Sequence, residues 1–356
     1  EMCIRDRFSY NSIKSNHAPL GPYLGNGDVG VVAFTSDNSQ TLKISKVDFV
    51  TDGWNDWAGS GPAALPVGGV SITINSSVYS GFTSVNYPDT TAFNYQMDQL
   101  AAELRMRTAT AQLVQMTSWM GSSENVIVTE LTTTSKDAVS VSVNTYADSQ
   151  SEHYATTADL QGDLQLVTRQ TNREGVRWIS QAGIATKIIG ATASNEKLSD
   201  SMVRSTFRLM PSDTVLVVTY VSGGGMDNNA RLSEATEKLL SWNEKEIALL
   251  KAEREDWWKE MWTRSYVETY DDLLNRHYLS SIYLLASAYN EHSPVCGGMY
   301  GVWNMDDKMM YHGDIHLNYN SQAGFYSAFS ANRPEIALPF YKTCLLYTSD
   351  AADDLI

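Results

Sequence analysis

The first two thirds of the chain alternate apolar and polar residues with the period of a β-strand. Residues 137–144 read Asp-Ala-Val-Ser-Val-Ser-Val-Asn, as a strand with one buried face requires. Similar short apolar runs, separated by turn residues, occur at 104–106, 114–116, 126–128, 184–189 and 215–218. No crossover helices separate these runs, so the pattern predicts a large antiparallel β-sandwich rather than a parallel α/β fold.

The hydrophobic period changes after the three glycines at 223–225. Of the 23 glycines, 18 lie in residues 1–225, and neither Gly nor Pro occurs from 226 through 293. From about 228 to 261 the apolar residues follow a helical period, which predicts one unusually long amphipathic helix. Its N-cap is expected at Asp227, Asn228 or Asn229.

Two more helical segments are expected towards the C-terminus. One runs from about 271 to 290 and ends before Pro294 and the Gly297-Gly298 pair. Another begins near Ser321 and continues past Ala337, interrupted or restarted at Pro334. The predicted organisation is a multidomain β + α chain, with a sandwich over 8–225, a helical linker over 226–270 and a further helical domain over 271–343.

Both ends of the chain look like translated sequencing-adapter read-through of the kind found in metagenomic assemblies. They read Glu-Met-Cys-Ile-Arg-Asp-Arg over 1–7 and Cys-Leu-Leu-Tyr-Thr-Ser-Asp-Ala-Ala-Asp-Asp-Leu-Ile over 344–356. We expect both segments to be non-native and the chain to be a truncated fragment. Cys296 is then the single cysteine of the genuine part, and one cysteine forms neither an internal disulfide nor a zinc site.

Composition narrows the class of partner. The chain has 26 Lys and Arg against 41 Asp and Glu, a formal net charge of −15. Because this charge repels a polyanion, we expect no nucleic-acid partner. Polar residues interrupt every apolar run before the roughly 18 to 20 residues that cross a bilayer, so no membrane span is expected either. With 43% apolar residues, the chain can bury a core.

One stretch concentrates residue types suited to carbohydrate chemistry. Residues 300–307 and 311–320 combine Trp, Tyr, His, Asp and Asn in a loop between predicted helices. Aromatic faces stack on sugar C–H surfaces, while Asp, Asn and His offer donors and acceptors to hydroxyl groups. In an extended segment, residues two positions apart point the same way and could line one pocket. The residues with this spacing are Asp314, His316, Asn318 and Asn320.

Two other interpretations of this cluster stay open. His312 and His316 have the i, i+4 spacing of a helical zinc pair, although Gly313 weakens a helix between them and the Glu expected after the first His is absent. Alternatively, the polar side chains only satisfy backbone groups of the loop.

The same residues resemble glycoside hydrolase family 95, which contains α-L-fucosidases and α-L-galactosidases of the six-hairpin superfamily. The resemblance covers most of the genuine chain and is carried by Leu24-Gly-Asn-Gly-Asp-Val-Gly30, Met299-Tyr-Gly-Val-Trp-Asn304, Asp314-Ile-His-Leu-Asn-Tyr-Asn320 and Asn332-Arg-Pro-Glu335. It implies an N-terminal antiparallel β-sandwich, a helical linker and, from residue 271, the start of an incomplete (α/α)6 catalytic barrel.

The resemblance also implies residue roles. Members of the family are inverting glycosidases, in which two Asn residues help a downstream Asp to hold the attacking water and a Glu acts as general acid. Asn318 and Asn320 match the catalytic Asn pair, Asp314 and His316 become candidate ligands for sugar hydroxyls, and Trp303 becomes a stacking wall. The catalytic Glu and Asp are expected beyond residue 343, so the fragment is expected to be inactive. No cofactor or metal is implied.

The sequence therefore predicts a fragment of a secreted or periplasmic inverting glycoside hydrolase. Its expected partner is an oligosaccharide or glycan with a terminal α-L-fucose or a related sugar. Two alternatives remain: a sugar phosphorylase of the same architecture, in which phosphate replaces water, and a non-catalytic carbohydrate-binding protein. The sequence specifies no oligomeric state.

Overall fold

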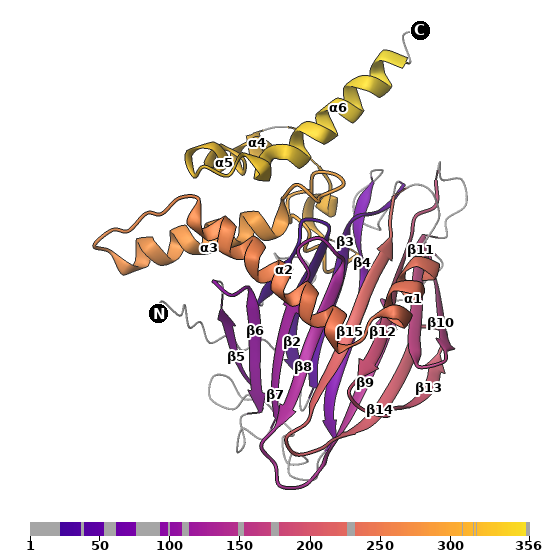
Figure 1. Cartoon of the computed structure of the whole chain (residues 1–356). Helices are drawn as coiled ribbons and strands as arrows, with labels where there is room; N and C mark the ends of the chain where they lie inside the picture. Colours follow the sequence, from indigo (N-terminus) through magenta and orange to yellow (C-terminus); the bar gives the residue numbers. More distant parts are fainter. Residues whose placement is uncertain are drawn as a thin grey trace.

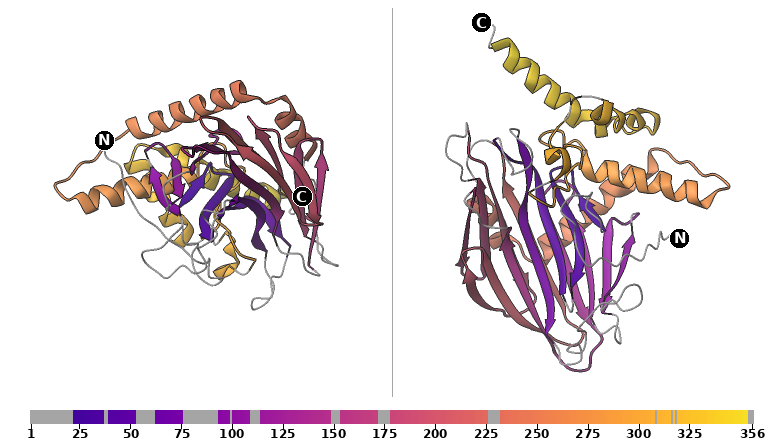
Figure 2. Two further views of the ribbon diagram at one scale, coloured as in Figure 1. Left: turned by 90° about the horizontal axis from the view of Figure 1, so that it is seen from below. Right: turned by 180° about the vertical axis from the view of Figure 1, so that it is seen from behind.

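The molecule consists of two packed β-sheets, with helices over the outer face of one sheet and at one end of the sandwich, and we describe it from a computed structural model (Figure 1). The structure describes residues 22–353 except 37–38, 53–61, 76–92, 99, 109–113, 149–152, 172–177, 226–231, 308, 316 and 318. The right panel of Figure 2 shows the C-terminal helix projecting away from the sheets at one end of the sandwich.

Every pair of neighbouring strands in both sheets is antiparallel. The first sheet has the order β1 (Tyr23–Gly25), β2 (Val29–Ser36), β3 (Ser39–Thr51), β4 (Ala63–Asn75), β9 (Val139–Ala147), β14 (Met202–Leu209) and β13 (Ser194–Ser199). The second has the order β10 (Tyr154–Gln161), β11 (Leu164–Thr171), β12 (Gln181–Ile189), β15 (Thr214–Gly223), β8 (Val126–Thr133), β7 (Val114–Met120), β6 (Glu103–Thr108) and β5 (Phe93–Asp98). The predicted antiparallel β-sandwich is confirmed.

The main core lies between the two sheets and follows directly from the period-two pattern. In β9, Val139, Val141 and Val143 are buried in one cluster with residues of the opposite sheet such as Ile184 and Val217. Fully burying a side chain of this size contributes about 1.5–3 kcal/mol. A second cluster on the outer face of the second sheet is covered by α1 (Leu232–Ser241) and the start of α2 (Glu244–Thr263), so that sheet is buried on both faces.

The single long helix predicted over 228–261 is wrong, because the structure forms two helices, α1 (Leu232–Ser241) and α2 (Glu244–Thr263). Asn243 is extended between them and caps α2. Its side chain accepts a hydrogen bond from the Lys245 N–H at 2.8 Å, while Glu246 accepts one from the Asn243 N–H at 3.2 Å. This capping box starts a new helix although the apolar stripe continues. The expected N-cap at Asp227, Asn228 or Asn229 lies outside the described residues.

The helix predicted over 271–290 is confirmed as α3 (Asp272–Ala288), whose N-cap Asp271 accepts bonds from two backbone N–H groups. The next predicted helical segment forms, but with more interruptions than the expected one at Pro334. It is divided into α4 (Tyr319–Ala323), α5 (Tyr326–Ser330), the 3-10 turn η3 (Pro334–Ala337) and α6 (Leu338–Asp353). Asn332, at a φ of 57°, follows α5 in a left-handed conformation that ends the helix. The restart at Pro334 is as predicted.

The glycine-rich segment 24–30 is where the helical part contacts the sandwich. It forms a tight turn between β1 and β2. A Cβ on Gly25 would lie 2.5 Å from the carbonyl oxygen of Ser287 in α3, and one on Gly30 would lie 2.2 Å from that of Val302. The Tyr283 hydroxyl adds a hydrogen bond of 2.6 Å to the Tyr23 carbonyl. Glycine is therefore needed here because two backbones meet directly.

None of the helices in the described ranges is long and apolar enough to cross a membrane.

Candidate functional site

The loop that follows α3 is fixed against the first sheet at Trp303. The indole N–H of Trp303 donates to the Leu24 carbonyl at 2.9 Å, and its ring lies 5.0 Å from that of Tyr23. The neighbouring Val302 carbonyl accepts a hydrogen bond from the Ser45 hydroxyl of β3. Only 8% of Trp303 is exposed. Its position is thus determined by strands that precede it by more than 250 residues.

A buried ion pair holds the same loop a few residues further on. Arg169 in β11 is fully buried, and its Nη1 and Nη2 donate to the two carboxylate oxygens of Asp307 at 2.8 and 2.6 Å. Nη1 also donates to the Pro66 carbonyl at 2.8 Å, and the guanidinium lies 4.3 Å from the centre of the Tyr154 ring. The planar guanidinium thus binds the carboxylate in two places, which fixes both the distance and the orientation of the loop.

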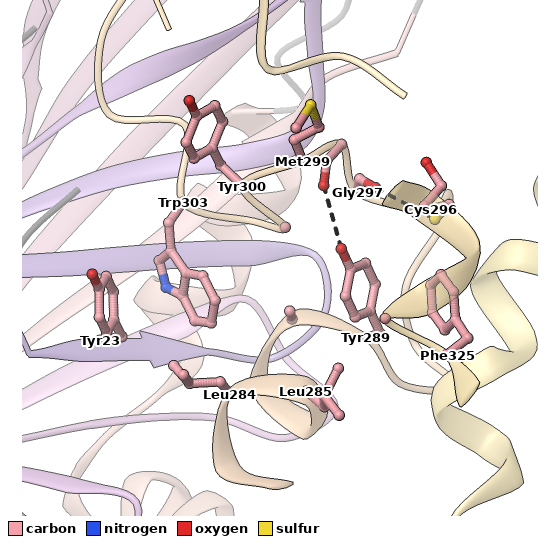
Figure 3. Close-up of a pocket in the computed structure, with 15 residues that line it drawn as sticks. Tyr23, Leu284, Leu285, Tyr289, Cys296, Gly297, Met299, Tyr300, Trp303 and Phe325 are labelled. Atoms are coloured by element: carbon pink, nitrogen blue, oxygen red, sulfur yellow. Dashed lines mark hydrogen bonds between the residues drawn. The ribbon is translucent and has the colours of Figure 1, made fainter. Parts of the chain in front are cut away.

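An aromatic pocket of about 350 Å³ opens between the end of α3, this loop and α4–α5 (Figure 3). Its walls include the aromatic side chains of Tyr23, Tyr289, Tyr300, Trp303 and Phe325. The Tyr289 hydroxyl donates to the Gly298 carbonyl at 3.3 Å, which ties the pocket wall to the loop. None of the side chains that line this aromatic pocket is charged.

A second pocket, here called the junction pocket, has a volume of about 310 Å³. Cys296 and Gly298 line both pockets, so the two cavities are neighbours. The sandwich contributes the other walls of the junction pocket through β3, β4 and the residues beside β12 and β15, including Asp48 and Trp178. The helical part contributes Asp314 and Ile315.

The carboxylate of Asp48 is held by a buried lysine. Lys46 is 5% exposed, and its ammonium donates to Asp48 Oδ1 at 2.7 Å and to Asp28 Oδ1 at 2.8 Å. Burial works to lower the pKa of Lys46, but the two carboxylates outweigh it and the pKa is raised. The lysine therefore stays charged and fixes Asp48 beside the pocket. Asn125 supports this arrangement by donating to Asp28 Oδ2 at 2.7 Å.

Cys296 is unsuited to act as a nucleophile in either pocket. Burial, with a smaller contribution from Cys344, raises the pKa of its thiol to about 12. The thiol is therefore protonated at neutral pH, whereas the thiolate is the reactive form and the metal ligand. Within the part of the chain that the structure describes, no group of three His, Cys, Asp or Glu residues could hold a metal ion. The zinc alternative remains untested because His316 is not among the described residues.

The predicted site residues that the structure describes do not all face one cavity. Trp303 lines the aromatic pocket and Asp314 lines the junction pocket, so these two predicted sugar contacts face neighbouring cavities rather than one. His316 and Asn318 lie outside the described residues. The backbone of Asn320 belongs to α4, which begins at Tyr319. The expectation of an extended segment through residue 320 is therefore wrong at its end, and the proposed role of each residue stays a prediction.

Sequence reasoning missed the residues that the sandwich contributes to these walls. Asp48 and Trp178 are 130 positions apart in the sequence, and each stands in an ordinary strand or connecting segment. Arg169 lies in a strand, and there the period-two pattern predicts only whether a side chain is buried or exposed, not what it contacts. The one available signal was that Arg169 is the single charged residue of its strand, since an arginine that becomes buried requires a partner.

Comparisons with known proteins support the fold. No protein-family model matches the chain, and no curated protein matches it. A solved structure from the human microbiome, described as a kojibiose phosphorylase, matches 84% of the chain with a TM-score of 0.59 and 12% identity. A family GH92 alpha-mannosidase from Bacteroides thetaiotaomicron covers 75% of the chain, with a TM-score of 0.40 and 13% identity.

The first of these similarities establishes a sandwich-plus-helices fold that this chain shares with a larger protein. The chain spans 45% of the length of that structure and 39% of the length of the mannosidase. Neither comparison identifies family 95, which therefore remains a prediction from the sequence motifs.

Proposed function

We propose that the chain is the sandwich and first helical portion of a glycoside-processing enzyme. The observation that carries this proposal is the pair of adjacent pockets at the contact between sandwich and helices. One has aromatic walls, and the other combines Trp178 with the carboxylates of Asp48 and Asp314. Aromatic surfaces beside fixed hydrogen-bond acceptors suit a sugar ring, which is apolar on its faces and carries hydroxyl groups on its rim.

The reaction we propose is hydrolysis with inversion at a terminal α-L-fucose or a related sugar. The support is the resemblance of the 299–304 and 314–320 motifs to glycoside hydrolase family 95. Inversion requires a water molecule between two carboxyl groups on opposite faces of the sugar. Neutral amides such as those of Asn318 and Asn320 orient that water without adding another charge, while a Glu and an Asp from further along the enzyme act as acid and base.

A test of this proposal uses a full-length homologue that carries the same motif. Asn318→Ala and Asn320→Ala are each expected to preserve the fold and to remove most of the turnover of an aryl α-L-fucoside, because the attacking water loses an orienting partner. Gln322→Ala is the matched control, since it removes an exposed amide from α4, the helix that contains Asn320. Circular dichroism checks the fold. Full turnover in both Asn variants would reject their role.

A second candidate reaction is phosphorolysis. It is favoured by the similarity to a structure described as a kojibiose phosphorylase. In that reaction inorganic phosphate attacks the anomeric carbon in place of water, and the product is a sugar 1-phosphate. Incubating the full-length homologue with substrate in the presence and absence of phosphate separates the two reactions, because only phosphorolysis makes cleavage depend on phosphate.

A further inference from the structure

The junction pocket differs from the aromatic pocket in its chemistry. Its apolar walls are formed largely by short aliphatic side chains such as Val47, Val50 and Ala64, with one large aromatic side chain, Trp178. The Trp178 indole N–H donates to the Val50 carbonyl at 3.4 Å, which orients the ring against β3. A flat apolar surface of this kind accepts the C–H face of a ring.

Two carboxylates complete the pocket from opposite domains. Asp48 belongs to β3 of the sandwich, where Lys46 holds its Oδ1. Asp314 belongs to the loop of the helical part, and Arg169 fixes that loop through Asp307. Carboxylates accept hydrogen bonds from hydroxyl groups and repel anions, and Lys46 neutralises only part of the local charge because it also binds Asp28.

The volume of the junction pocket limits the size of its ligand. At about 310 Å³ it lies near the lower end of the range of roughly 300–1,000 Å³ that is usual for ligand pockets. The cavity therefore fits one monosaccharide unit rather than a longer chain. Its ligand is expected to have an apolar face for Trp178 and several hydroxyl groups, and to carry no negative charge.

We propose that the junction pocket is a binding subsite for a neutral monosaccharide unit, with Trp178 as its stacking surface and Asp48 and Asp314 as acceptors of its hydroxyl groups. This inference rests on the proposed function and extends it, because it assigns part of sugar recognition to the sandwich. It also sets the substrate class, since glycans with a uronic acid or a sugar phosphate at this position are rejected by the carboxylates.

Binding to the 356-residue chain tests the subsite without any need for turnover. Saturation-transfer NMR and fluorescence titration would use methyl α-L-fucopyranoside and methyl α-D-glucopyranoside as neutral probes and D-glucuronate as the anionic probe. We expect at least one neutral probe to bind, and D-glucuronate to bind at least about ten-fold more weakly than the best neutral probe. Asp314→Asn should narrow that difference because it removes one of the repelling charges.

Two variants of different kinds locate the binding. Trp178→Ala removes the stacking surface. Val50→Trp places a large ring in the cavity at a position whose side chain is half-buried. If one variant has a folding defect, the other still tests the pocket. Each should weaken binding of the neutral probe by at least about ten-fold. Tyr266→Ala, which changes a 63% exposed ring, is the control and should bind as the wild type does.

The proposal is overturned if neither neutral probe binds, if both pocket variants bind as tightly as the wild type, or if D-glucuronate binds as tightly as the neutral probes. These results are distinct from failure of the proposed function, which is judged by turnover of the full-length homologue. An enzyme that cleaves glycosides while the junction pocket binds no sugar would refute the subsite alone.

Discussion

Replacing Arg333 with alanine is expected to lower the free energy of unfolding by about 3–5 kcal/mol, because it leaves several hydrogen-bond acceptors unpaired at about 1–3 kcal/mol each and opens a cavity. The Arg333 side chain is fully buried. Its Nε and Nη2 donate to the Met261 carbonyl at 3.1 and 2.8 Å, and its Nη1 donates to the Ser265 hydroxyl and the Ala331 carbonyl, each at 2.6 Å. Met261 lies in the last turn of α2, so the variant leaves terminal carbonyl groups buried without a donor.

Two further variants make this prediction specific. Arg333→Lys retains the charge but not the planar set of donors, and we expect it to lose most of the same stability. Arg276→Ala removes an exposed arginine from α3 and should change stability by no more than about 0.5 kcal/mol. Guanidinium denaturation followed by tryptophan fluorescence gives all three values. A loss below about 1 kcal/mol for Arg333→Ala would contradict the role of Arg333 as the cap of α2.

The second large effect is expected from Gly30→Ala, which should destabilise the contact between the sandwich and the helical part by about 2–4 kcal/mol. The new Cβ would lie 2.2 Å from the Val302 carbonyl oxygen and 2.9 Å from Cδ1 of Trp303. Because the nearest atom is backbone, a simple change of side-chain rotamer does not relieve the clash. The loop must therefore move away from β2, and the hydrogen bond from Trp303 to the Leu24 carbonyl should weaken.

Amide hydrogen exchange distinguishes displacement of this loop from general unfolding. In Gly30→Ala, protection should fall in residues 296–315 while the central strands of both sheets stay protected. Gly324→Ala is the matched control, because its nearest neighbouring atom would be an ordinary 3.8 Å from the new Cβ. Equal stability and equal exchange in the two variants would show that the sandwich and the loop are not in the close contact described here.

Local patterns explain why the strands were predictable and why one helix boundary was missed. The alternation at 137–144 needs only neighbouring residues to specify a half-buried strand, and β9 forms there. The break at Asn243 is also encoded locally, since Asn243 and Glu246 have the spacing of a capping box. The apolar stripe continued across that position and concealed the signal. Periodicity reports which face is buried, whereas capping residues determine where a helix begins.

The candidate site was less predictable because its walls come from distant parts of the sequence. The residues of 300–320 suggested carbohydrate chemistry, and two of the predicted site residues, Trp303 and Asp314, line cavities. Their partners Asp48 and Trp178 come from separate parts of the sandwich, and only the topology of the sheets brings them to the same end of the molecule. Residue spacing in the sequence carries no information about such contacts.

Several motif residues that gave the family resemblance make structural contacts, either between the sandwich and the helical part or within the helical part. Gly25 and Gly30 allow close approach of backbones, Trp303 donates to a strand carbonyl, and Arg333 caps α2. Glu335 lies 2.5 Å from Arg264 in an ion pair. These residues preserve the arrangement of sandwich and helices, and the proposed chemistry depends on that arrangement together with Asn318 and Asn320.

The most direct test of the proposed reaction is the configuration of the first sugar released. A full-length homologue with the same motifs would be incubated with an aryl α-L-fucoside in phosphate-free buffer, and the anomeric proton would be followed by NMR before mutarotation. The account predicts that β-L-fucose appears first, because water attacks from the face opposite the leaving group. Initial release of α-L-fucose, or no release from any terminal α-L-glycoside, would contradict it.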